Sequence, residues 1–212
     1  MYLSDVLQSA GMTNAQIQAQ PYMNDTQNPD YYRYHYNTNW QDKVLGDNYS
    51  QNYFLKITGG DNIAKYALSM GYLNSNGTID NTNLARYNTN FNADLNLSSR
   101  LTATANLSFT NIEQELRDQG RSFSTNPILL GLTKSPFLPV NQVSDEGVES
   151  PNLADVDIFN RSNPFAVIED AQQSNKSYRF FGSTKFNYAF SNTVSLNSLI
   201  GVTFDKVREN TF

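Results

Sequence analysis

The sequence predicts an all-β fold: a partial transmembrane antiparallel β-barrel of about six strands in three hairpins, with a long loop that carries short helices. Three observations predict it. Six segments alternate between apolar and polar residues, tight turns alternate with longer connections, and aromatic side chains gather at one end of the apolar face. Helical membrane spans are excluded, because no run approaches the roughly 18 apolar residues that such a span needs.

Residues 1–47 precede the predicted hairpins and lack strand alternation. They predict loops and short helices. Thr13 is followed three residues later by Gln16, and this spacing is the capping-box pattern of a helix over 14–19.

The predicted strands fall in two groups, four in 48–111 and two in 176–212. Their alternating segments are 49–57, 64–72, 85–97, 101–109, 178–190 and 194–204. Alternation with period two is typical of a strand whose two faces meet different surroundings. In the third segment the apolar set includes Phe91, and the polar set is Asn88, Asn90, Asn92, Asp94 and Asn96. We expect this polar set to line a water-filled lumen and the apolar set to face lipid.

The connections between these strands alternate in length. Tight turns are predicted at 59–62, 98–100 and 191–193, whereas a medium loop covers 74–83 and a long loop covers 112–175. All long connections therefore share one end of the sheet, as in outer-membrane barrels with short periplasmic turns and longer extracellular loops. At that end each strand carries an aromatic residue on its apolar face: Tyr49, Tyr72, Tyr87, Phe109, Tyr178 and Phe204. Such a row is expected of an interfacial aromatic girdle.

A soluble β-sandwich is the alternative, because its strands alternate in the same way over a core. We favour the barrel because sandwich strands are usually shorter and rarely place every long loop at one end. Six strands alone leave open edges in lipid, so we interpret the chain as a piece of a longer barrel protein. The first residues show no signal-peptide pattern, which agrees with that interpretation.

The amino-acid composition excludes several kinds of functional site. There is no cysteine, which excludes disulfides, thiolate zinc sites and a cysteine nucleophile, and there is one histidine, His35. The net charge of −5 disfavours nucleic acid as a partner. We expect no enzyme activity, no catalytic residues, no cofactor and no metal site.

The 112–175 loop holds 10 acidic and four basic residues. Asp155 and Asp157 could bind calcium, but no EF-hand pattern is present and a solvated acidic loop is favoured. Glu113 with Glu115, or Asp155 with Asp157, could suggest a glycosidase carboxylate pair, which we disfavour because nothing near them supplies a hydrophobic pocket or a second polar constellation.

Two Asn-Pro pairs in the long loop, at Asn126-Pro127 and Asn163-Pro164, each precede a short apolar run. Asn at the N-cap with Pro at the first helical position predicts a helix at both places. These helices could dock a protein lid, but packing of the loop onto the barrel mouth is the favoured interpretation.

Aromatic residues cluster near the end of the first segment, at Tyr31, Tyr32, Tyr34, Tyr36 and Trp40. They could stack on sugar rings, although anchoring of a loop is the commoner use. His35 lies among them without a second candidate metal ligand nearby.

Several motifs resemble those of the SusC/RagA family in residue sequence, order and spacing over nearly the whole chain. They are NPD (28–30), NTNWQD (37–42), QNYFLKITGG (51–60), YALSMGY (66–72), NGTI (76–79), RYNTNFN (86–92), SPFLPV (135–140), NPF (163–165) and YRFFG (178–182).

The resemblance implies an early-to-middle stretch of a TonB-dependent transporter barrel in the outer membrane of a Gram-negative bacterium of the Bacteroidetes. Its implied partners are outer-membrane lipid, a SusD-like surface lipoprotein, a glycan, oligosaccharide or peptide ligand, and the TonB complex acting through a plug region outside this chain. Two rival functions stay open at this point: a soluble binding or adhesion domain, and a TonB-dependent receptor for a siderophore or vitamin.

Overall fold

The computed structural model describes residues 2–171 and 173–211, which form two compact units. We call residues 48–77, 82–116 and 173–211 the sheet unit, and residues 2–47, 78–81 and 117–171 the loop unit. The loop unit is assembled from segments that are distant in the sequence. The two units are described separately below.

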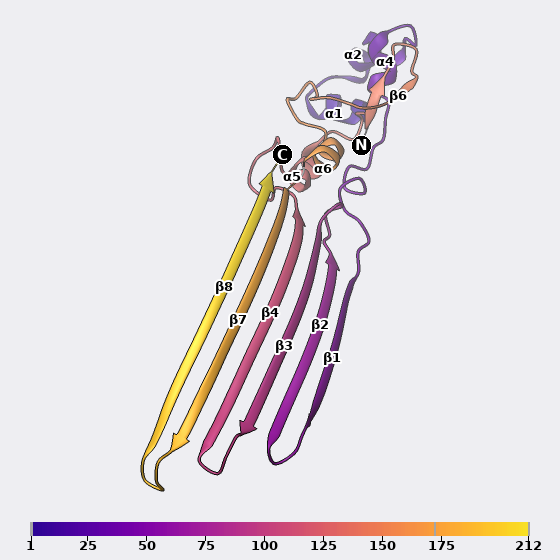
Figure 1. Cartoon of the computed structure of the whole chain (residues 1–212). Coiled ribbons are helices and arrows are strands. Elements are labelled where there is room, and N and C mark those ends of the chain that lie inside the picture. Colours follow the sequence, from indigo (N-terminus) through magenta and orange to yellow (C-terminus); the bar gives the residue numbers. More distant parts are fainter. Residues whose placement is uncertain (1, 172, 212) are drawn as a thin grey trace. The chain divides into compact units, whose positions relative to one another are not determined.

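The sheet unit is one antiparallel meander, in which each strand pairs with the next strand of the sheet unit along the chain (Figure 1). Its six strands, in spatial order, are β1 (Ser50–Gly60), β2 (Ala64–Asn76), β3 (Asn83–Asn96), β4 (Leu101–Leu116), β7 (Gln173–Ala189) and β8 (Ser195–Thr211). The predicted all-β fold of three hairpins is confirmed, and the sheet is not closed within the chain.

One face of the sheet is apolar, because residues opposite each other in the register share a face. A representative row runs Leu55, Met70, Thr89, Phe109, Phe180 and Phe204. The next row toward the long connections runs Tyr53, Tyr72, Tyr87, Asn111, Tyr178 and Lys206. The Tyr72 and Tyr87 rings lie 4.7 Å apart, and Tyr53 stacks on Tyr72 at 6.4 Å.

These two rows contain the predicted aromatic girdle with one correction. Tyr72, Tyr87 and Tyr178 lie in one row and Phe109 and Phe204 in the adjacent row. Tyr49, however, precedes β1, and Tyr53 occupies the row instead. The sequence pattern is ambiguous here because positions 49 and 53 have the same parity along the strand.

The opposite face is polar and carries cross-strand hydrogen bonds. Ser108 Oγ donates to Asn90 Oδ1 at 2.7 Å, and Thr104 Oγ1 donates to Asp94 Oδ1 at 2.8 Å. Farther along, Arg179 Nε donates to Asp205 Oδ1 at 2.7 Å. Side chains predicted to share a face therefore do share it.

Strands extend farther toward the long connections than their alternation predicts. β4 continues to Leu116, so Glu113 and Glu115 lie in a strand and not in the predicted loop. There Glu113 forms an ion pair with Lys176 of β7 at 3.3 Å. The 17 residues of β7 span about 55 Å, whereas a strand tilted by about 45° needs about 35 Å to cross the ~25 Å apolar band of a membrane barrel. Polar cross-strand pairs allow a strand to continue where its apolar face has ended.

The turn between β1 and β2 is determined by two residues. Gly60 has φ +143°, and a Cβ there would collide with the carbonyl oxygen of Ala64. Asp61 Oδ1 accepts hydrogen bonds from the amides of Ile63 at 2.7 Å and Ala64 at 2.8 Å. These amide bonds lower the pKa of the Asp61 carboxyl.

The loop unit contains short helices and one small hairpin. They are α1 (Leu3–Ser9), α2 (Asn14–Gln18), α3 (Pro21–Asn24), α4 (Pro29–Arg33), α5 (Pro127–Thr133), α6 (Pro164–Asp170), β5 (Asn141–Val143) and β6 (Glu149–Leu153). The predicted capping box is confirmed, with the Thr13 amide donating to Gln16 Oε1 at 2.8 Å. Alternation does not predict β5 and β6, because they are too short. Among the described residues, no helix combines the length and the apolar character that crossing a membrane requires.

Two buried apolar clusters support the loop unit. One is formed by Trp40, Phe137 and Leu138. The other joins Val44 and Ile79 to Ile168 of α6. In both clusters, residues near the N-terminus pack against residues of the long loop.

Candidate functional site

Backbone hydrogen bonds align residues 36–38 beside residues 136–138. The amide of Thr38 donates to the Pro136 carbonyl at 2.7 Å, and Thr38 Oγ1 donates to the Leu138 carbonyl at 2.7 Å. Trp40 Nε1 donates to the Ser135 carbonyl at 2.9 Å. The Ser-Pro-Phe-Leu-Pro segment at 135–139 is therefore fixed on the segment before β1.

Asn163 connects α6 to the residue just before β5 and the residue just after β6. Its Oδ1 accepts from the Phe165 amide at 3.1 Å and thereby caps the helix. Its Nδ2 donates to the carbonyls of Val140 at 2.8 Å and Ala154 at 3.1 Å. The side chain is 2% exposed, so all these bonds form away from water. Asn126 caps α5 in the same manner, and both predicted helices are present.

A buried ion pair fixes the segment between β6 and α6. Lys134 Nζ lies 2.8 Å from Asp157 Oδ2, with side-chain exposures of 1% and 6%. The same ammonium donates to the carbonyls of Arg161 and Ser162 and lies over the Trp40 ring. Asp157 Oδ1 accepts from the Phe159 and Arg161 amides, both at 2.9 Å. Asp157 is thus buried and paired, which corrects the expectation of a uniformly solvated acidic loop.

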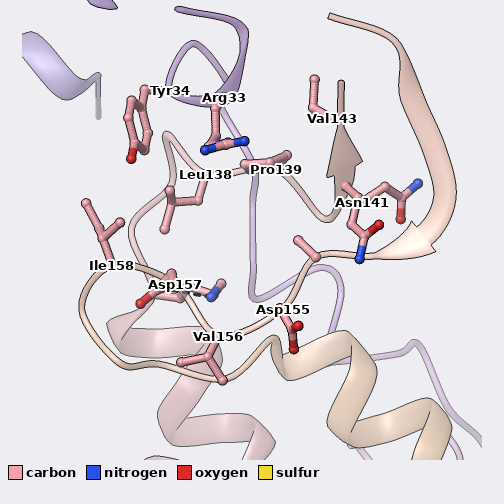
Figure 2. Close-up of a pocket in the computed structure, with 13 residues that line it drawn as sticks. Arg33, Tyr34, Leu138, Pro139, Asn141, Val143, Asp155, Val156, Asp157 and Ile158 are labelled. Atoms are coloured by element: carbon pink, nitrogen blue, oxygen red, sulfur yellow. Dashed lines mark hydrogen bonds and ion pairs between the residues drawn. The ribbon is translucent and has the colours of Figure 1, made fainter. Parts of the chain in front are cut away.

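These supports surround an open pocket of about 400 Å³ in the loop unit (Figure 2). Its walls come from α4, the 134–143 segment and the 154–158 segment. Apolar side chains supply most of the lining, namely Tyr34, Leu138, Pro139, Val143, Val156 and Ile158. Its size lies within the range of small-ligand sites.

Besides the buried Lys134–Asp157 pair, two opposite charges line the same pocket, Arg33 and Asp155 (Figure 2). The Arg33 guanidinium uses Nη1 to contact Asp30 Oδ1 at 3.1 Å, which leaves most of its five N–H donors available. No hydrogen bond or ion pair joins the Asp155 carboxylate to another described residue. The pocket therefore offers one cationic group, one anionic group and the amides of Asn141 and Gln142 on an apolar floor.

Two tyrosines of the loop unit have raised pKa values. Burial, followed by the nearby Asp30 charge, raises the pKa of Tyr34. Burial and a hydrogen bond to the Glu149 carboxylate raise the pKa of Tyr36 to about 12. Both side chains are therefore neutral phenols near pH 7.

The predicted aromatic cluster is divided between several places. Trp40 is 2% exposed and its indole N–H is used internally, so it offers no platform to a ligand. Tyr31 stacks on His35 at 4.2 Å, and Tyr34 packs edge-on to Phe137. Of the cluster, Tyr34 lines the pocket. Within the described ranges, no group of three or more possible metal ligands occurs, at Asp155 and Asp157 or elsewhere.

Comparison with known proteins identifies the type of chain. It is 26% identical over 180 residues to TonB-dependent receptor P26 of Formosa agariphila. The aligned region covers 83% of this chain and 17% of that protein. It is 25% identical over 166 residues to TonB-dependent receptor SusC of Bacteroides thetaiotaomicron, over 73% of this chain and 17% of that protein. The chain is similar to a segment of SusC/RagA-like TonB-dependent receptors. No protein-family model matches it.

Solved structures agree in fold with the SusC/RagA-like chain. The RagAB peptide importer in its open-open state superposes with a TM-score of 0.74 over 100% of this chain and 26% of that chain, at 16% identity. The closed-closed state gives 0.67 over 84% of this chain and 20% of that chain, at 18% identity. The SusC/RagA-like chain thus spans about a sixth of the length of its curated relatives, and its fold matches part of the RagAB chain.

Proposed function

We propose that this SusC/RagA-like chain supplies a stretch of barrel wall and an extracellular ligand-contacting loop to an energy-coupled importer of the outer membrane. The observation that carries the proposal is the similarity to TonB-dependent receptors along most of the chain, on a sheet with one apolar and one polar face. In this proposal the apolar face meets lipid and the polar face lines the lumen.

The importer would act with two protein partners. A SusD-like surface lipoprotein would cover the loop unit, and the TonB complex would act through a plug region outside this chain. The solved neighbour is named the RagAB peptide importer, and its two-letter designation supports a partner of that kind. On α5, Leu130 is buried whereas Leu132 is 60% exposed, so the helix both packs the loop and offers an apolar side chain to a partner.

For the cargo, the loop pocket favours a short peptide over a glycan. Its aliphatic walls suit an apolar side chain, and Arg33 and Asp155 suit the carboxylate and ammonium of a zwitterion. A sugar site ordinarily presents a broad, flat aromatic face, whereas Trp40 is buried in the cluster with Phe137 and Leu138 and Tyr34 is the one aromatic ring among the described lining residues.

Uptake by the intact transporter tests this function. We expect cells whose transporter carries Asp155→Asn or Arg33→Gln to need at least about tenfold more peptide for half-maximal growth on peptides, since each change removes a charge-assisted contact. The matched control is Asp145→Asn, an exposed acid of the same loop that does not line the pocket. Deletion of the gene without any loss of peptide or oligosaccharide uptake would contradict the function itself. Loss of oligosaccharide uptake alone would contradict only the choice of cargo.

A further inference from the structure

A second hollow lies on the apolar face of the sheet unit, where that face becomes charged. It has a volume of about 440 Å³ and lies on β4, β7 and β8. Its lining consists of four aromatic residues and three cations: Phe109, Tyr178, Phe180, Phe204, Lys176, Lys206 and Arg208. Nothing in the proposed import function uses this hollow, because it lies on the face opposite the polar lumen residues.

The register orders these groups along the strands. Phe109, Phe180 and Phe204 form one row, and Tyr178 with Lys206 belongs to the next row toward the long connections. The row beyond pairs Lys176 with Arg208. Rows on one face are two residues apart, about 7 Å. The cations thus begin at the Tyr178 row and extend about 7 Å beyond it, on the same face.

Within the described residues, most of the charges in this hollow have no oppositely charged partner. Lys176 pairs with Glu113 at 3.3 Å, and this pair is half-exposed. Among the described residues, the side chains of Lys206 and Arg208 make no hydrogen bond or ion pair. Three cations against one carboxylate leave a net positive charge directly above aromatic rings that are 37–58% exposed.

We propose that this hollow binds the phosphate-bearing headgroup of an outer-leaflet lipid, with the acyl chains lying against the aromatic rings below. The proposal rests on the placement of the apolar face in lipid. In a barrel, the aromatic girdle lies at headgroup depth, so cations just beyond it meet lipid phosphates. Basic pockets at that depth bind anionic headgroups, and each cation there contributes about 1 kcal/mol. A free phosphate would use the cations but would leave the aromatic half of the hollow exposed.

Binding of lipid A to the full-length protein in detergent tests the site. We expect Lys206→Gln with Arg208→Gln to weaken lipid A binding about 30-fold, as two headgroup contacts are lost. Lys185→Gln is the matched control, because Lys185 is an exposed cation of β7 on the polar face. It should leave the dissociation constant within about twofold. Native mass spectrometry reports bound lipid, and heat-modifiable mobility on gels reports folding of each variant.

Two further variants separate the site from a general loss of structure. Lys206→Arg with Arg208→Lys keeps both charges and should retain binding within about threefold. Glu113→Gln removes the one carboxylate beside the hollow and should tighten binding several-fold. A damaged fold would not produce tighter binding.

The source of the phosphate is tested separately. Lipid A stripped of its phosphates should bind wild type as weakly as intact lipid A binds the double variant. Inorganic phosphate alone should neither saturate the protein nor compete with lipid A at equal concentration. The proposal is overturned if inorganic phosphate binds as tightly as lipid A, or if the double variant binds lipid A like wild type. Uptake measured in the double variant is a separate readout, so failure of this site leaves the import function standing.

Discussion

At the scale of single residues, the buried Lys134–Asp157 pair has the largest expected effect on the loop unit. Lys134→Met removes the cation and leaves a buried carboxylate, which costs about 3–5 kcal/mol in comparable sites. We expect the amides of Phe159 and Arg161, which donate to Asp157, to lose most of their protection from hydrogen exchange. Lys176→Met is the control, because its pair with Glu113 is half-exposed and contributes at most about 1 kcal/mol. Unchanged protection in Lys134→Met would show that the pair does not hold this segment.

Tyr36 provides a pH-dependent prediction at the same scale. Its pKa in the folded chain is about 12, above the usual 10.0, so the folded state holds the phenol proton more tightly. The corresponding stabilisation is complete below pH 10 and is lost as the pH rises toward 12. The difference in tyrosinate absorbance between wild type and Tyr36→Phe should therefore show a step near pH 12. Glu149→Gln should move that step to lower pH, and a step near pH 10 in wild type would contradict the assignment.

At the scale of elements, two substitutions of Asn163 distinguish its role as the cap of α6 from its role as a tether to Val140 and Ala154. Asn163→Ala removes the cap and both Nδ2 bonds, so α6 should lose at least the roughly 1–2 kcal/mol that a cap contributes. Asn163→Asp keeps an acceptor for the Phe165 amide but loses the two donors. Exchange of the α6 amides in the full-length protein measures both variants. If Asn163→Asp matches wild type, the tethers to Val140 and Ala154 contribute nothing.

Alternation predicts the elements of the sheet well in their centres and poorly at one end. The strands, the tight turns and both Asn-Pro helices follow from local rules of period and capping. The ends of β4, β7 and β8 do not, because polar residues occupy both faces there, as Asp205, Lys206 and Glu209 illustrate. The pocket could not be predicted either. Its walls join α4 to residues about a hundred positions away, through contacts such as Thr38 with Leu138.

At the scale of the whole molecule, we expect the two faces of the sheet to meet different surroundings, lipid on the apolar face and lumen water on the polar face. Leu107 and Phe91 are register partners on the apolar face, whereas Asn90 and Ser108 are hydrogen-bonded on the polar face. A one-residue slip would exchange the two faces, so adjacent positions of β3 distinguish lipid from lumen sharply.

Cysteine substitution in the full-length protein tests this arrangement, and the chain helps because it has no cysteine of its own. Asn90→Cys should react with a water-soluble maleimide in intact outer membranes and should resist quenching by a lipid-dissolved quencher. Phe91→Cys should behave in the opposite manner, since its side chain would lie in hydrocarbon. Asn88→Cys and Thr89→Cys repeat the test one step along β3, where Thr89 lies on the apolar face. If Asn90→Cys were quenched from the lipid while Phe91→Cys reacted from water, the lumen assignment would be inverted. If the protein folded in buffer without detergent and none of the four positions were quenched from lipid, the sheet would belong to a soluble β-domain.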